Sequence, residues 1–275
     1  MASCCRGNFS PRRSALAKAA QLPLRCALFS LAVAATAQSD WKIISADSEP
    51  GNAGVVHRQV VLQDSGRNEN ATIDLALFST KSCTLRVIDQ PPASRSDLAR
   101  VMQQQKCLAG VNGGYFDADF APIGLRIVNE QITAPLQRAR LITSVLFASP
   151  RGVQIVRTRE FSRRAKVTAA IQCGPLLVDL AQRVRGLNDS HPARRTFAAT
   201  GTKDRALLGV CSEVSLAELA TILATTQFAG DLKIERALNL DGGSSSAFWF
   251  ARENGSAFSI PEQKTVRDFV AVVPK

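Results

Sequence analysis

The chain is built mainly of short apolar or alternating segments, each bounded by Gly, Asn, Asp or Ser, and this pattern restricts the fold most. Alternation with a period of two separates buried from exposed side chains along a strand, and the bounding residues favour turns. Strands are expected at 41–45, 55–62, 72–78, 84–88, 124–128, 144–148, 153–157, 175–178, 196–200, 206–214, 237–240, 246–250 and 269–273.

Two segments show helical spacing instead. The first has Ser96 as its expected N-cap, Asp97 in the first turn and an apolar face that continues to about Lys106. The second starts at Ser215, which with Glu218 forms the pattern of a capping box. Because the helices do not alternate regularly with the strands, the pattern predicts a single α+β domain of mixed or antiparallel β-sheets with a few interspersed helices.

The first 37 residues differ from the rest. They contain five basic and no acidic residues, an apolar run at Cys26–Ala35, and the sequence Ala-Thr-Ala at 35–37. This order is typical of a secretory signal peptide, here cut before Gln38, and the run is too short to span a bilayer. The sequence therefore predicts a signal peptide at 1–37, a domain at 38–275, and a periplasmic or secreted protein of a bacterial envelope.

Removal of the five basic residues lowers the formal charge from +11 to about +6. The densest basic patch, 157–166, lacks interleaved aromatic side chains, so a solvated surface is favoured over a nucleic-acid site. The charge is compatible with a phosphate-bearing glycan or sugar phosphodiester as partner. No nucleic acid and no stable membrane insertion after cleavage are expected, and the sequence carries no signal for the oligomeric state.

Four cysteines remain in the expected mature chain. An even number in an oxidising compartment favours two disulfides, and four cysteines allow three pairings. We favour Cys83 with Cys107 and Cys173 with Cys211, because each pair brackets neighbouring elements. No Cys-x-x-Cys spacing is present, which argues against structural zinc.

Three glycine-bearing turns follow apolar strands: "VNGGYF" (111–116), "QCGPLLV" (172–178) and "NLDGGSSS" (239–246). Glycine permits close approach of another backbone or a ligand, and successive N–H groups in such turns can hold an anion. Each turn taken alone is equally typical of a β-hairpin.

In their order along the chain, and with "VNGGYFDADFAPIGLRI" and "ARRTFAATG", these turns resemble the phosphodiester glycosidase family. The resemblance extends from about Ser82 to Lys275 and implies cleavage of a sugar phosphodiester. Ser244 departs from the third glycine that many members carry. The matching positions are Asn112, Gly113, Gly114, Phe116, Gly124, Gly174, Pro175, Arg195, Thr196, Asp241, Gly242, Gly243 and Ser245.

Cleavage of this kind requires positive charge for the phosphate and a carboxylate near the anomeric carbon. Arg195 is the candidate for the phosphate, because a guanidinium binds phosphate bidentately, and Arg194 is a weaker one. Asp241 is the candidate for acid–base or nucleophilic catalysis, with Asp117 or Asp119 as a second carboxylate. The structural alternatives are a surface ion pair for Arg195, an Asx-turn for Asp241 and solvated loop acids for the other two.

Substrate contacts are expected from the remaining polar and glycine residues of the turns. No cofactor or resident metal is expected, because only two histidines are present, although a calcium site near Asp241 or Asp117 is left open. The candidate substrate-binding residues are Asn112, Gly113, Gly114, Gly174, Thr196, Asn239, Gly242, Gly243, Ser244, Ser245 and His191.

The sequence thus favours an exported hydrolase that cleaves the glycosidic bond of a sugar-1-phosphodiester. Two other functions stay open. One is a non-catalytic periplasmic domain that binds glycan, although the few aromatic side chains argue against it. The other is a metal-dependent phosphodiesterase that attacks phosphorus instead of carbon.

Overall fold

The computed structural model describes residues 41–91, 93, 95–162 and 166–275. The expected signal peptide lies outside these residues and stays a prediction. Among the residues described, no helix combines the length and the apolar character needed to cross a membrane.

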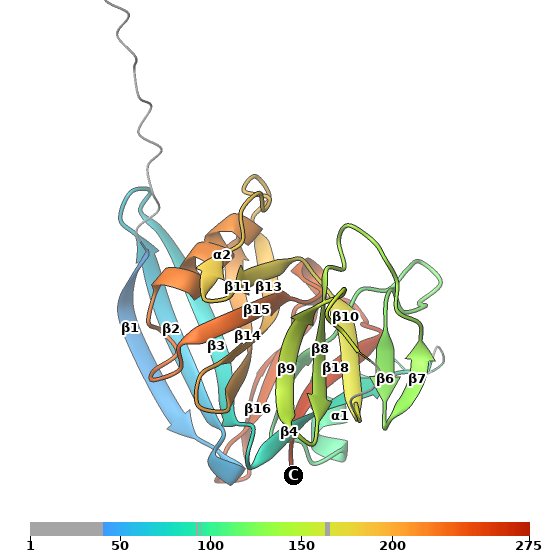
Figure 1. The fold of residues 1–275 in the computed structure, drawn as a ribbon. Coiled ribbons are helices and arrows are strands. Elements are labelled where there is room, and N and C mark those ends of the chain that lie inside the picture. The colour runs from blue at the N-terminus through green and yellow to red at the C-terminus, as the bar shows by residue number, and fades with distance from the viewer. Residues whose placement is uncertain (1–40, 92, 94, 163–165) are drawn as a thin grey trace, which may run out of the picture. The chain divides into compact units, whose positions relative to one another are not determined.

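The strands of the described chain form three antiparallel sheets (Figure 1). The largest has the order β1 (Trp41–Pro50), β2 (Val56–Asp64), β3 (Glu69–Ser79), β14 (Arg205–Val214), β13 (Ala193–Gly201), β15 (Ile234–Asn239), β11 (Leu176–Asp179) and β12 (Gln182–Arg183). The second has β7 (Gln131–Ala134), β6 (Arg126–Val128), β10 (Ala169–Cys173), β8 (Ser144–Ser149) and β9 (Gly152–Arg157). The third has β17 (Ala257–Ile260), β16 (Phe248–Ala251), β5 (Ala109–Asn112), β18 (Asp268–Pro274) and β4 (Cys83–Asp89).

The three sheets share one central apolar core and bury further apolar clusters on their other faces. Strand β18 shows how the sequence produces this arrangement. Val270 and Val272 contribute to the central core, whereas Phe269, Ala271 and Val273 pack on the opposite face with α1. The two-residue period of a strand thus divides its side chains between two cores.

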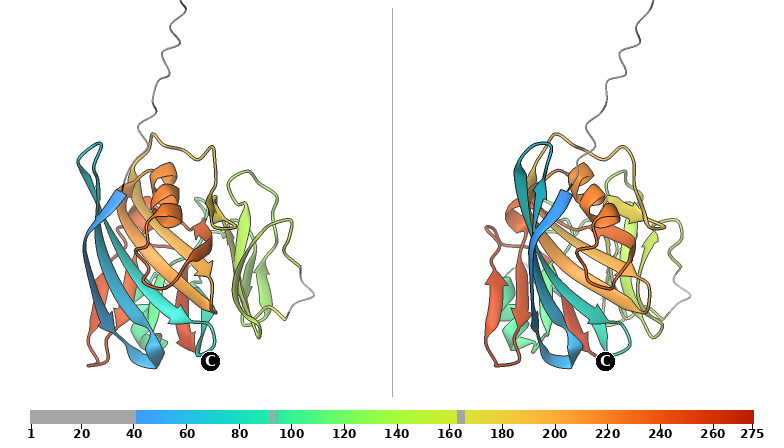
Figure 2. Two further views of the ribbon diagram at one scale, coloured as in Figure 1. Left: turned by 60° about the vertical axis from the view of Figure 1, so that its left-hand side comes forward. Right: turned by 90° about the vertical axis from the view of Figure 1, so that its left-hand side faces the viewer.

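Two α-helices cover outer faces of the sheets in the described chain. Helix α1 (Leu98–Gln104) packs beside the third sheet, and α2 (Leu216–Thr225) lies across the largest sheet (Figures 1 and 2). The capping box of Ser215 and Glu218 is confirmed. The expected N-cap at Ser96 is wrong, because the Asp97 side chain accepts the Arg100 N–H at 2.8 Å. Single 3-10 turns occur at η1 (Asn52–Gly54) and η2 (Gly243–Ser245).

The expected single unit of antiparallel sheets is confirmed for the described chain, but the α+β class is not. Strands account for most of its regular structure, and the two helices are short. Sequence patterns overlooked β7, β12 and β17, which are short or largely exposed. The molecule is therefore nearer to an all-β protein.

The expected disulfides are not formed in the structure, where all four described cysteines are free and buried. Cys83 belongs to the central core, whereas Cys107 packs with α1 on the other face of the third sheet. Cys173 likewise lies in the central core, and Cys211 lies beneath α2. A disulfide requires adjacent Cβ atoms, which residues separated by a sheet do not offer.

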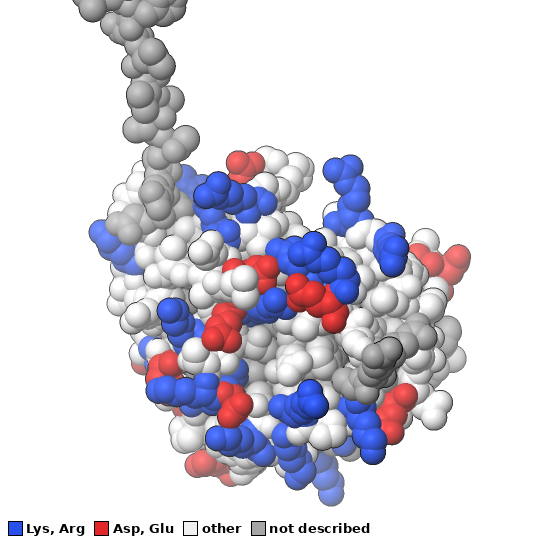
Figure 3. Space-filling model, in the orientation of Figure 1, with Lys and Arg blue, Asp and Glu red and all other residues white. Residues whose placement is uncertain are grey.

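Charged side chains are distributed over the surface. On the face drawn in Figure 3, Lys and Arg lie singly or beside Asp and Glu over much of the visible surface. Arg236 illustrates this mixing, because it pairs with both Glu160 at 2.7 Å and Asp179 at 3.1 Å. This mixing agrees with a mild excess of positive over negative charge. In that view no large area of the surface is purely basic.

Candidate active site

The three glycine-bearing turns meet in space. The Tyr115 hydroxyl, from the first turn, donates to the Gly174 carbonyl of the second at 2.6 Å. The Asn239 side-chain amide, from the third turn, donates to the same carbonyl and to the Tyr115 oxygen, both at 3.0 Å. One backbone carbonyl therefore joins segments that lie far apart in sequence.

Asn112 ties the first and third turns together at the end of β5. Its amide nitrogen donates to the Asp241 carbonyl at 2.7 Å, and its oxygen accepts from the Thr196 hydroxyl at 2.7 Å and from the Ala247 N–H at 3.0 Å. The side chain is completely buried. Asn112 and Thr196 therefore hold the site together instead of facing solvent.

Gly113 and Gly114 allow the first turn to lie directly against Asp268 of β18. The Gly113 N–H donates to the Asp268 carbonyl at 2.8 Å, and the Gly114 N–H donates to its carboxylate at 2.9 Å. A methyl group on Gly113 would overlap this carboxylate. The Gly113 carbonyl in turn accepts the Asp241 N–H at 3.0 Å, so the first turn positions the third.

A buried ion pair supports this turn. Arg126 of β6 and Asp268 are both fully buried, and their side chains approach to 2.5 Å. Burial raises the pKa of Asp268 to about 6, while Arg126 and the Gly114 N–H oppose the rise. The sequence analysis did not single out either residue. A charged residue inside an otherwise apolar strand was the available signal, because such a residue needs a partner.

Asp241 is the half-buried carboxylate of the third turn. Burial raises its pKa, whereas Ser245, the Lys264 charge and the Gly242 N–H lower it. The Gly242 N–H donates to the carboxylate at 3.0 Å. The Ser245 hydroxyl is near enough to lower this pKa but forms no hydrogen bond of ordinary geometry.

The residues that follow Asp241 shape a short 3-10 turn. Gly243 has a φ of 63°, in the left-handed region that glycine adopts without strain. The hydroxyls of Ser245 and Ser246 are buried and have no hydrogen-bond partner among the described residues. Ser244 contributes through its carbonyl, which accepts the Gln263 N–H at 2.8 Å and the Lys264 N–H at 3.2 Å.

Lys264 is a cation of the site that sequence reasoning missed. Its charge acts on Asp241, and its ammonium group lies 5.3 Å from the centre of the Phe116 ring. The Lys264 N–H donates to the Ser244 carbonyl, and this contact positions the residue. A contact between residues 20 positions apart cannot be recognised from a local sequence pattern. Lys264 and Phe116 therefore belong to the immediate surroundings of Asp241.

Arg195 lies against the third turn, but its guanidinium is turned to backbone carbonyls. A Cβ on Gly242 would lie 3.9 Å from both Cα and Cδ of Arg195. The guanidinium donates to the Val214 carbonyl at 2.9 Å and to the His191 carbonyl at 2.5 Å. Burial lowers its pKa. Arg195 is thus beside Asp241 in the fold without an ion pair to it among the contacts described.

Other expected residues have different environments. Arg194 donates to the Ser246 carbonyl at 2.5 Å, which anchors the third turn. The His191 ring is exposed beside the Ser190 hydroxyl, 2.8 Å away, and reaches Arg195 only through its carbonyl. Asp117 is exposed and accepts the N–H groups of Asp119 at 3.0 Å and Ala121 at 2.8 Å. These are the contacts of a residue that caps its own turn.

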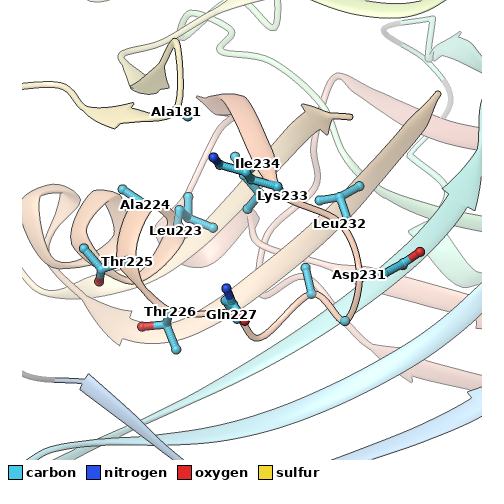
Figure 4. Close-up of a pocket in the computed structure, with 12 residues that line it drawn as sticks. Ala181, Leu223, Ala224, Thr225, Thr226, Gln227, Asp231, Leu232, Lys233 and Ile234 are labelled. Carbon is cyan, nitrogen blue, oxygen red and sulfur yellow. The ribbon is translucent and has the colours of Figure 1, made fainter. Parts of the chain in front are cut away.

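The described residues contain no group of three or more His, Cys, Asp or Glu side chains arranged to hold a metal ion. A hollow of about 350 Å³ lies between the end of α2 and the start of β15 (Figure 4). Its lining includes Thr225, Gln227 and Lys233 but none of the three glycine turns. It is therefore separate from the candidate site.

Comparisons with known proteins identify the class of protein that these turns define. The family model for phosphodiester glycosidases matches residues 105–273. This match covers the three turns, Arg195 and Lys264. The chain belongs to the phosphodiester glycosidase family. The comparison with curated proteins finds no match.

Solved structures share the fold. The catalytic domain of zebrafish N-acetylglucosamine-1-phosphodiester alpha-N-acetylglucosaminidase, auto-inhibited by its pro-peptide, is 14% identical with a TM-score of 0.58, over 86% of this chain and 83% of that one. A hypothetical protein from Synechocystis is 14% identical with a TM-score of 0.58, over 84% of this chain but 64% of that one, just under two thirds. A Burkholderia pseudomallei protein named as exported is 12% identical with a TM-score of 0.55, over 75% of each chain.

Proposed function

We propose that the protein hydrolyses the bond between the anomeric carbon and the phosphate oxygen of a sugar-1-phosphodiester. The observation that carries the proposal is the position of Asp241, a half-buried carboxylate at the junction of three glycine turns with a cation beside it. Membership of the phosphodiester glycosidase family supports the reaction class. The zebrafish protein of similar fold is named for activity on an N-acetylglucosamine-1-phosphodiester.

Asp241 acts at the anomeric carbon in its ionised form, either as base toward water or as nucleophile. The C1–O bond breaks, and its electron pair leaves with the phosphate, which becomes a monoester. Water supplies the hydroxyl that the sugar gains. Because a phosphate is a good leaving group, one carboxylate is sufficient for this reaction.

Lys264 and Arg195 supply the positive charge that the phosphate requires. Lys264 is the more direct of the two, because its charge already acts on the Asp241 carboxylate. The hydroxyls of Ser245 and Ser246 are buried and have no hydrogen-bond partner among the described residues, so they are the unused donors of this turn. Asn112 holds the backbone of the turn at Asp241, and Thr196 donates a hydrogen bond to Asn112.

The test uses purified residues 38–275 with an N-acetylglucosamine phosphodiester in ¹⁸O-labelled water. The expected result is release of the sugar with the label at C1 and an unlabelled phosphomonoester. Label in the phosphate would instead indicate attack at phosphorus, and sensitivity to a chelator would then identify a metal-dependent phosphodiesterase. A folded protein that releases no sugar but binds the glycan would be a binding domain.

Export is a second part of the proposal, with residues 1–37 as the signal. Support comes from the basic start, the apolar run and the Ala-x-Ala sequence, together with the exported neighbour of similar fold. Mass spectrometry of the protein recovered from a bacterial periplasm should find Gln38 at the N-terminus. Recovery of the full-length chain from the cytoplasm would contradict export.

A further inference from the structure

A second basic site lies beside the candidate active site. A pocket of about 780 Å³ is formed by the segments 136–143 and 157–161. Four arginines line it, together with apolar side chains that include Leu136 and Phe161: Arg138, Arg140, Arg157 and Arg159. Arginines that line one concave surface raise the positive potential there, and this potential attracts anions.

Three of these arginines are not paired with an acidic side chain in the described part of the protein. Arg157 pairs with Asp179 at 2.7 Å. Arg138, Arg140 and Arg159 form no ion pair with any described residue and are exposed. Charge that the fold does not use is available to a ligand, and guanidinium groups match phosphate oxygens through paired N–H donors.

The loop that carries Arg138 and Arg140 is held in place by one buried side chain. Gln172 of β10 is completely buried. Its oxygen accepts the Gln137 N–H at 3.0 Å, and its nitrogen donates to the carbonyls of Gln137 at 2.7 Å and Ile142 at 3.1 Å. Both ends of the arginine loop are thus fixed before a ligand binds, which lowers the entropy lost on binding.

The same loop lies against the active-site turn. A methyl group on Gly174 would overlap the Leu141 carbonyl, so these two backbones are in contact. The Gly174 carbonyl is the acceptor that joins Tyr115 and Asn239. The Leu176 N–H also donates to the Thr143 hydroxyl at 2.9 Å. The arginine pocket and the candidate active site therefore flank one shared segment.

The geometry points to an additional anion subsite: the arginine pocket binds a second phosphate of the substrate chain, so that the substrate is a glycan with more than one phosphodiester. The reacting phosphodiester lies at Asp241, and the substrate continues over the exposed Leu141 to Arg138 and Arg140. This inference rests on the proposed function for the reacting bond. The charge of the pocket can be tested independently of that reaction.

The first experiment measures binding of inorganic tripolyphosphate by calorimetry. The variant Arg138→Gln/Arg140→Gln should bind about tenfold more weakly than the unaltered protein, a loss of about 1.4 kcal/mol. Arg100→Gln/Arg185→Gln, which removes the same charge from two exposed positions outside the pocket, should bind normally. Equal affinities for the two double variants would overturn the subsite.

The second experiment compares hydrolysis of a substrate with one phosphodiester and a substrate with two. The Arg138→Gln/Arg140→Gln variant should raise KM for the longer substrate about tenfold, with kcat and the shorter substrate unaffected. The charge-reversed variant Arg138→Glu/Arg140→Glu should raise it further. An equal rise for both substrates would place the reacting phosphate in the pocket and overturn the inference.

The two experiments separate the two proposals. If no variant or unaltered protein hydrolyses either substrate, the proposed function fails, while tripolyphosphate binding still decides whether the pocket is an anion site. If tripolyphosphate binding depends on the two arginines but KM for the longer substrate does not, the pocket serves a free phosphate ligand, and the substrate inference is overturned.

Discussion

The side-chain amide of Asn112 donates a hydrogen bond of 2.7 Å to the main-chain oxygen of Asp241, across 129 residues of sequence. Asn112 also accepts hydrogen bonds from Thr196 and Ala247. Because the hydrogen bond from Asn112 uses the main-chain oxygen of Asp241, Asn112 positions the residue without occupying its carboxylate. The main chain of the site is thus held by buried hydrogen bonds, while the Asp241 carboxylate accepts the N–H of the neighbouring Gly242.

Asn112→Ala should lower the free energy of unfolding by about 3 kcal/mol, because it leaves several buried polar groups without partners. Urea denaturation measures the loss. Asn254→Ala is the matched control, since its side chain bonds only within an exposed turn, and it should cost under about 1 kcal/mol. If both variants lost a similar free energy of unfolding, the buried hydrogen bonds of Asn112 would not be important for stability.

Gly113→Ala should destabilise the protein by about 3 kcal/mol, because the added methyl group overlaps the Asp268 carboxylate. Gly66→Ala is the control, since a Cβ there meets its nearest atom at an ordinary 3.4 Å. Thermal and urea unfolding of the two variants measure the difference. A Gly113→Ala protein of normal stability would show that the first turn does not require this close approach.

Arg126→Met should cost about 3–5 kcal/mol at pH 7, because it leaves the buried Asp268 carboxylate without its partner. The cost should be smaller at pH 5. Asp268 already has its pKa raised to about 6, and loss of the arginine raises it further, so the carboxyl takes up a proton instead of remaining charged. The exposed pair of Lys81 and Asp204 provides the control, since Lys81→Met should cost under about 1 kcal/mol at either pH.

The value of kcat/KM should fall as the pH falls through the pKa of Asp241, because only the ionised carboxylate is active. Burial raises that pKa, so the acid limb should lie above the ordinary aspartate range. Lys264→Met removes a charge that lowers the pKa, and the limb should therefore move to higher pH. Lys203→Met, in an exposed turn, should leave the profile of kcat/KM against pH in place. If Lys264→Met left the acid limb of the pH profile unchanged, Lys264 would not be influencing the pKa of Asp241.

Local patterns in the sequence are sufficient for most strands and for both helices. The alternation in β18 and the capping box of α2 are features of adjacent residues, so they can be recognised without the fold. The turn at Asp241 is visible for the same reason. Its partners Tyr115 and Asn112 were within recognised motifs, but their hydrogen bonds across sheets depend on the way the strands pack.

The features that sequence reasoning missed depend on long-range packing. Lys264 reaches Asp241 because the Ser244 carbonyl holds its backbone, and Arg126 meets Asp268 only after two sheets close on each other. The disulfide expectation failed for the same reason. Cys83 and Cys107 bracket neighbouring elements along the chain, but the third sheet places them in different cores.

The most direct test is the replacement Asp241→Asn, measured as kcat on a sugar-1-phosphodiester together with the Kd for the same compound. The backbone contacts of Asp241 survive this change, so we expect a folded protein whose kcat falls about 10³-fold while Kd changes little. Asp47→Asn, on the exposed strand β1, should retain full kcat. An Asp241→Asn protein with undiminished kcat would contradict catalysis by this carboxylate.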